Sequence, residues 1–217
     1  MRGQGRKQGG RTGMRILRGL ALIGLLAGPL WAGEAGDLVF AQRGPWDLSQ
    51  GPLVWMLHQT GPQAEGFAPL GEGTVSLGAA TDAPHGQPAL ELTEKTPRTT
   101  RKIGPFPVSG GDPALTFFLE TTARDMAALT GGSPFYIRNR LKDALFRSGE
   151  IRHEGEATVA VFVPFAQDEN RGRMAGFDTL ELRFTLDDPG RPIRRMLAET
   201  GPLSGGRPAY HSEMVLK

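Results

Sequence analysis

The corner between two predicted helices holds the residues best suited to bind an anion. These residues are Gly131, Gly132, Ser133, Arg138 and Arg140. Glycines let the backbone approach a ligand, and the free N–H groups at the start of a helix attract negative charge. An arginine about one turn into the helix can add a charge-assisted hydrogen bond to a phosphate or carboxylate. The pattern indicates an anion- or ligand-binding site, with an ordinary helix corner and solvated arginines as the alternative.

A charged loop over 167–176 is the second candidate site. It contributes Asp168, Glu169, Arg171 and Arg173, and it connects two segments that we expect to pair as a hairpin. Long loops between strands often carry function. The alternative is a solvated loop whose charges pair with one another.

The spacing of reactive side chains assigns no catalytic residue. No serine stands in the Gly-x-Ser-x-Gly pattern of a nucleophile elbow. The histidines are scattered, and none is locally tied to a serine and a carboxylate; they are His58, His85, His153 and His211. The catalytic residues of any activity therefore stay unassigned.

Metal and cofactor chemistry has equally little support. His153, Glu154 and Glu156 lie within four residues but lack the two-histidine helical spacing of the zinc proteases. The chain has no cysteine, which excludes disulfides, a thiol nucleophile and cysteine-ligated zinc. We expect no metal and no cofactor.

The first 35 residues have the layout of an export signal. Basic residues precede an apolar run over 19–32, and small residues follow it. The run is shorter than the roughly 20 residues that a membrane span needs. We expect a signal peptide over 1–35, cleaved after Ala35 or, less suitably, after Ala32. A retained anchor is the alternative.

Two further features concern the ends of this segment. Met14 begins a tidier signal and is an alternative start, which would place residues 1–13 outside the protein. The remaining residues, 36–217, are enough to bury a core, and we expect them to form a single domain.

The charge balance argues against nucleic acid as a partner. The chain has 25 basic and 23 acidic residues, of which six basic and one acidic residue lie within 1–35. The segment 36–217 therefore holds 19 basic and 22 acidic residues and is slightly acidic at neutral pH. The basic character belongs to the export signal, so we exclude a nucleic-acid role.

Two consecutive helices are predicted over 112–149. Asp112 and Ser133 are N-cap residues, each followed by a proline at the first helical position. Gly131 and Gly149 are natural stops. The second helix is apolar on two sides, because Phe135 and Phe146 lie nearly opposite its main stripe. Such a helix is usually covered on both sides, for example by a sheet and by a neighbouring helix.

Apolar alternation on either side of the helices predicts strands. We expect strands over 52–59, 74–79, 89–95, 98–103, 157–165, 177–186 and 208–216, a short strand over 38–40 and a short helix over 192–199. The order has no alternation of strands and helices. It predicts an α+β fold: a curved antiparallel sheet with a central pair of α-helices packed on one face.

These observations favour a non-enzymatic bacterial envelope protein, periplasmic or secreted. We expect it to bind a small or lipid-like ligand, or another envelope protein, between sheet and helices, with no membrane span after signal removal. An exported hydrolase with dispersed acid–base residues is the alternative, and a purely structural role is the third. A closed apolar pocket would favour binding, whereas converging carboxylates or histidines with shifted pKa values would favour an enzyme.

Overall fold

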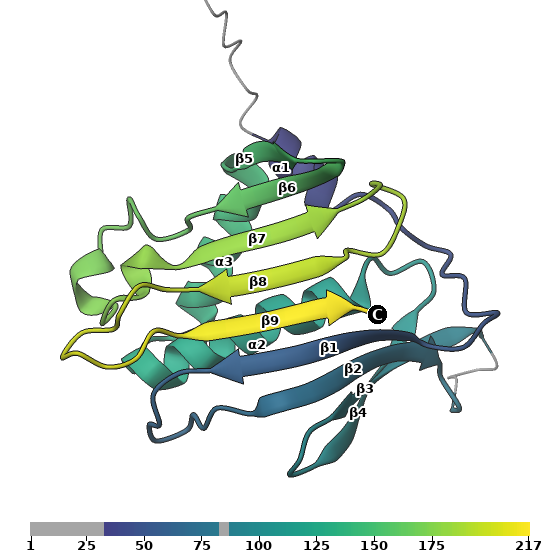
Figure 1. The fold of residues 1–217 in the computed structure, drawn as a ribbon, viewed down its shortest axis with the longest axis horizontal. Coiled ribbons are helices and arrows are strands. Elements are labelled where there is room, and N and C mark those ends of the chain that lie inside the picture. The colour runs from purple at the N-terminus through teal and green to yellow at the C-terminus, as the bar shows by residue number, and fades with distance from the viewer. Residues whose placement is uncertain (1–32, 83–86) are drawn as a thin grey trace, which may run out of the picture.

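A nine-stranded sheet and a helical pair make up the domain (Figure 1). The computed structural model describes residues 33–82 and 87–217, so the apolar run over 19–32 lies outside the described residues. The strands are β1 (Leu53–Thr60), β2 (Gly71–Ala79), β3 (Ala89–Lys95), β4 (Thr100–Pro107), β5 (Glu150–Glu154), β6 (Ala157–Phe162), β7 (Glu181–Leu186), β8 (Arg195–Glu199) and β9 (His211–Leu216). The helices are α1 (Glu34–Val39), α2 (Pro113–Thr130) and α3 (Pro134–Arg147), with short 3-10 turns η2 (Arg171–Arg173) and η3 (Phe177–Thr179).

The sheet joins two meanders through the first and last strands. Its order is β4-β3-β2-β1-β9-β8-β7-β6-β5, and every neighbouring pair is antiparallel. The helices α2 and α3 carry the chain from β4 at one edge to β5 at the other, and Figure 1 shows them behind the sheet on one face. The predicted α+β class, with an antiparallel sheet and a central helical pair, is confirmed.

Both central helices begin where the capping pattern predicts. The side chain of Asp112 accepts hydrogen bonds from the backbone N–H groups of Ala114 and Leu115, at 2.9 and 3.1 Å. Gly131 ends α2 in the left-handed conformation, and Ser133 caps α3. None of the described helices is both long and apolar enough to cross a membrane.

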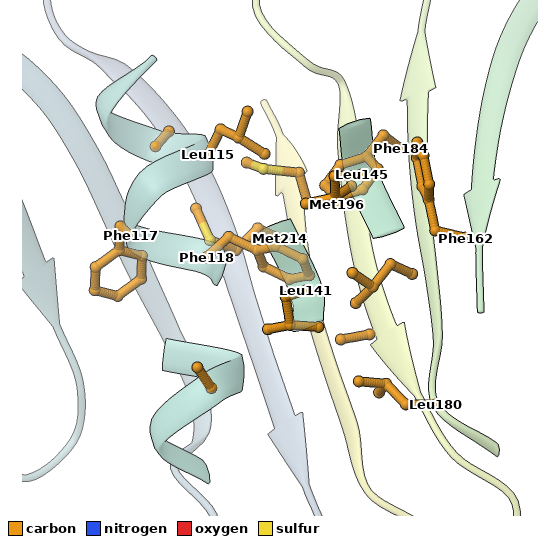
Figure 2. Close-up of a cluster of buried hydrophobic side chains, with 14 of the residues drawn as sticks. Leu115, Phe117, Phe118, Leu141, Leu145, Phe162, Leu180, Phe184, Met196 and Met214 are labelled. Atoms are coloured by element: carbon orange, nitrogen blue, oxygen red, sulfur yellow. The ribbon is translucent and has the colours of Figure 1, made fainter. Parts of the chain in front are cut away.

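The core lies between the helical pair and the central strands (Figure 2). Phe118 of α2 meets Phe184 of β7 edge to face, with ring centroids 6.0 Å apart, and Phe162 of β6 continues the cluster at 5.9 Å. Leu141 and Leu145 bring α3 into the same cluster. Full burial of a side chain of this size stabilises the fold by about 1.5–3 kcal/mol.

Three short elements differ from the sequence-based expectation. The segment 38–40, expected as a strand, belongs largely to α1, which covers α3. The segment 192–199, expected as a helix, contains β8, because pairing with β7 and β9 outweighs the helix propensity of Met196, Leu197 and Ala198. Strand β5, which contains His153, was not among the strands expected from the sequence.

The outer side of α3 also differs from expectation. Ile137, Leu141 and Leu145 are buried against the core. Phe135 is 71% exposed and Phe146 is 50% exposed, so neither ring is buried on the second side of the helix as expected.

Helix α1 packs tightly on α3 through a glycine. A Cβ atom added to Gly36 would lie 2.1 Å from the carbonyl oxygen of Leu145. Ala35 is buried beside it, and the guanidinium of Arg43 closes the helix by donating to the carbonyl groups of Leu38 and Val39 at 2.7 Å. Residues at the end of the expected signal segment are thus part of the folded domain.

The first prediction concerns this contact. Gly36→Ala should lower the free energy of unfolding by about 1–3 kcal/mol, because the added methyl group forces α1 away from α3. Gly172→Ala is the matched control, since a Cβ there would meet no heavy atom within 4 Å. Urea unfolding of both variants measures the difference; equal stability would contradict the close packing of α1.

Candidate functional site

A polar pocket of about 340 Å³ lies between α2 and one end of the sheet. Strands β1, β3 and β4 and the loop 61–70 supply its other walls. We call it the Asp125 pocket and define it by five of its polar lining residues, Gln59, Glu94, Arg101, Thr121 and Asp125. Among the hollows in the described part of the chain, this one combines titratable side chains with a position between α2 and the sheet.

Asp125 is held by two buried hydrogen-bond donors. The Tyr210 hydroxyl and the Gln59 Nε2 atom both donate to its Oδ2 atom, at 2.8 and 2.7 Å. Gln59 is itself fixed, because its Oε1 atom accepts from the Leu70 N–H at 3.2 Å. The Oδ1 atom of Asp125 has no hydrogen-bond partner within 33–82 and 87–217.

Burial changes the ionisation of both members of this pair. Desolvation raises the pKa of Asp125 to about 7; the Tyr210 hydrogen bond and the charge of Arg124 oppose this rise, and Glu94 adds to it. Burial and the nearby Asp125 raise the pKa of Tyr210 well above its usual value. The tyrosine therefore stays a donor, while the Asp125 carboxyl group can exchange a proton near neutral pH.

The opposite wall of the pocket carries a second carboxylate. Glu94 is 3% exposed and forms an ion pair with Arg101, the residue directly across from it on β4. The Thr121 hydroxyl is buried and has no partner in the described part of the chain. The pocket therefore offers two carboxyl groups, the guanidinium groups of Arg101 and Arg124, and an unpaired hydroxyl.

The sequence-predicted corner residues lie elsewhere. Gly132 and Ser133 line a separate hollow of about 300 Å³, together with Tyr136 and Arg173. Arg138 instead pairs with Glu120 of α2 at 2.8 Å. Gly131, Gly132 and Ser133 are consecutive and lie together just after α2. Arg138 and Arg140 do not join them, because each pairs with a carboxylate elsewhere.

Arg140 joins the two predicted sites. Its Nε atom donates to Asp168 at 2.7 Å, and the Tyr136 hydroxyl donates to the same carboxylate at 2.8 Å. Burial would raise the pKa of Asp168, but hydrogen bonds from Asn170, Tyr136 and Arg140 outweigh it and lower that pKa. Asp168 therefore fastens the charged loop to α3.

The other charged loop residues are less constrained. Arg171 donates to the Ala166 carbonyl group at 3.3 Å, and Glu169 is exposed. Within the described residues, no group of three histidine, aspartate or glutamate side chains is placed to hold a metal ion.

The sequence did carry a signal for the Asp125 pocket. Alternation puts Glu94 on the inward face with Leu90 and Leu92, and Gln59 on the inward face with Trp55 and Leu57. A polar residue at a core position needs a partner, so both positions marked a buried polar contact. Asp125 and Tyr210 had no comparable local signal.

No protein-family model, no curated protein sequence and no solved structure matches this chain.

The second prediction follows from the raised pKa of Asp125. The folded protein favours the protonated carboxyl group, so its stabilising contribution is complete below about pH 4 and is lost as the pH rises through about 7. Relative to Asp125→Asn, the wild type should lose about 2–4 kcal/mol of unfolding free energy between about pH 4 and 8. Urea unfolding across this pH range measures the difference, and parallel profiles would refute it.

The third prediction concerns the loop. Asp168→Asn should weaken the contacts with Arg140 and Tyr136 and lower stability by about 1–3 kcal/mol. Hydrogen exchange should rise within 167–176. Glu169→Gln, at the adjacent exposed position, should leave both measurements unchanged. Equal exchange in the two variants would show that Asp168 does not hold the loop.

Proposed function

We propose that this chain is an exported envelope protein that binds a small, hydrogen-bond-donating ligand in the Asp125 pocket. The free Oδ1 atom of Asp125 supports this most strongly, because it belongs to a fixed side chain that lines the pocket. A carboxylate accepts hydrogen bonds from hydroxyl and ammonium groups. We therefore propose that the ligand carries a hydroxyl or an ammonium group.

The size and lining of the pocket support a small ligand. Its volume of about 340 Å³ falls at the lower end of the range of about 300–1,000 Å³ for small-molecule sites. Glu94 adds a second acceptor, and the unpaired Thr121 hydroxyl can donate or accept.

The position of the core side chains favours this ligand over a lipid-like one. Phe118, Leu141 and Met214 fill the space between the helices and the central strands (Figure 2). An acyl chain placed between the helices and the sheet would have to displace them, whereas a small polar molecule enters the existing pocket. A partner protein in the envelope stays the other class of ligand proposed from the sequence.

Export is supported by the basic and apolar layout of the first residues. The packing of α1 distinguishes between the possible cleavage sites of the signal peptide, because Ala35 and Gly36 pack against α3. A cut after Ala32, or retention of the apolar run, leaves α1 whole. A cut after Ala35 removes the first two residues of α1, so we propose that the chain is cut after Ala32 or keeps the apolar run.

The fourth prediction tests the pocket. Native mass spectrometry of the protein from the envelope should detect a retained molecule, and a thermal-shift panel of monosaccharides and small amines should contain a ligand that raises the melting temperature. Glu94→Gln and Asp125→Asn should weaken that ligand at least about tenfold, because each removes an anionic acceptor. Glu169→Gln is the control, because it removes an exposed carboxylate outside the pocket.

Two outcomes would end this proposal. One is a panel in which no member shifts the wild-type melting temperature and no retained mass is found. The other is a ligand whose affinity is the same in both pocket variants. A ligand with an ammonium group should also bind more tightly above pH 7, because Asp125 is then ionised.

A hydrolase is the second candidate function. The pKa of Asp125 near neutrality suits a general acid or base, and Glu94 supplies a second carboxylate nearby. The ion pair between Glu94 and Arg101 weakens Glu94 as a nucleophile, and none of the described histidines lines the pocket. Turnover of a glycoside or ester that disappears in Asp125→Asn would favour this function over binding alone.

A further inference from the structure

The exposed side of α3 carries an aromatic surface. Phe135 and Phe146 are separated by eleven residues, which places them within about 20° of one another on the helix. Phe40, just after α1, stacks on Phe146 with ring centroids 4.7 Å apart. We call Phe40, Phe135 and Phe146 the aromatic ridge; all three are exposed to solvent.

An apolar groove runs beside this ridge. It has a volume of about 380 Å³ and lies between α2 and α3. Leu119, Leu141 and Leu145 line it together with Phe40 and Phe146. Large apolar groups that share one exposed face mark an interaction surface rather than scattered surface hydrophobics.

The start of the described chain lies at the same place. A Cβ atom added to Gly33 would be 3.9 Å from the backbone oxygen of Phe146, and Gly36 fixes α1 on α3. The residue before Gly33 is the last of the apolar run over 19–32, the longest apolar segment of the sequence. When that run is retained as an anchor, the membrane that holds it therefore lies next to the ridge.

We propose that the aromatic ridge is a membrane-contacting surface, which inserts its rings into the lipid bilayer to which the apolar run directs the chain. This inference rests on the export proposed above, but not on the Asp125 pocket. The bilayer is favoured over a protein partner because the sequence places the apolar run directly before Gly33, which lies beside this surface.

The charges around the ridge define the type of membrane contact. Lys142 and Arg147 are exposed on α3, and the exposed carboxylates of Asp143 on α3 and Asp37 on α1 offset their charge. This balance gives no large excess of positive charge. Insertion is therefore driven by apolar contact, and binding should depend only weakly on salt and on anionic lipid.

The fifth prediction uses the fact that the chain contains no cysteine. A fluorophore that reports polarity is attached to Asn139→Cys, between the two phenylalanines of α3, or to Thr60→Cys, on the opposite face of the sheet. The protein is used in the form recovered from the envelope and is mixed with phosphatidylethanolamine–phosphatidylglycerol vesicles. Emission at 139 should shift to shorter wavelength and be quenched by nitroxide-labelled lipid, whereas emission at 60 should not change.

A ridge variant provides the matching loss of binding. Phe135→Ser combined with Phe146→Ser should reduce vesicle binding at least about tenfold, because interfacial binding scales with inserted apolar area. Its melting temperature should stay near that of the wild type, since both rings are exposed. Pure phosphatidylcholine vesicles should bind the wild type nearly as well as anionic ones.

Several results would overturn the membrane assignment. Equal responses of the two labels, or unchanged binding by the double variant, would place the contact elsewhere. A label at 139 that is already shielded without lipid would show that another part of the chain covers the ridge. A wild-type dimer that the double variant abolishes would assign the ridge to self-association.

Discussion

The pairing of β1 with β9 is the interaction on which the rest of this structure depends. It runs from Trp55 opposite Leu216 to Thr60 opposite His211 and joins two meanders into one sheet. Only a continuous sheet gives α2 and α3 a face long enough to cross. Because its partners lie near the two ends of the domain, this pairing closes a long loop, and it has a correspondingly high entropic cost.

The same pairing assembles the candidate site. Gln59 belongs to β1 and Tyr210 precedes β9, and both donate to the one carboxylate of Asp125 on α2. Burial of that carboxyl group costs stability once it is ionised, as its raised pKa records. A core position filled by a group that destabilises the fold at neutral pH is where functional residues are expected.

Local patterns predicted the elements better than they predicted the site. Asp112 and Ser133 located both helices because a cap acts within a few residues, and the alternation around Leu90 and Leu92 located β3. The strand β8 was missed because its conformation is set by partners on either side. The Asp125 pocket was missed for the same reason: its groups come from separate elements, and spacing along the chain does not report their distance in space.

The two edges of the open sheet are unequal, and this has a consequence for assembly. Strand β4 has eight residues, of which Pro105 and Pro107 have no N–H group to offer a further strand. Strand β5 at the other edge has no proline, although Glu150 and Arg152 place charges along it. The edge with prolines therefore resists strand addition more than the other edge does, and this difference disfavours growth of an edge-to-edge fibre.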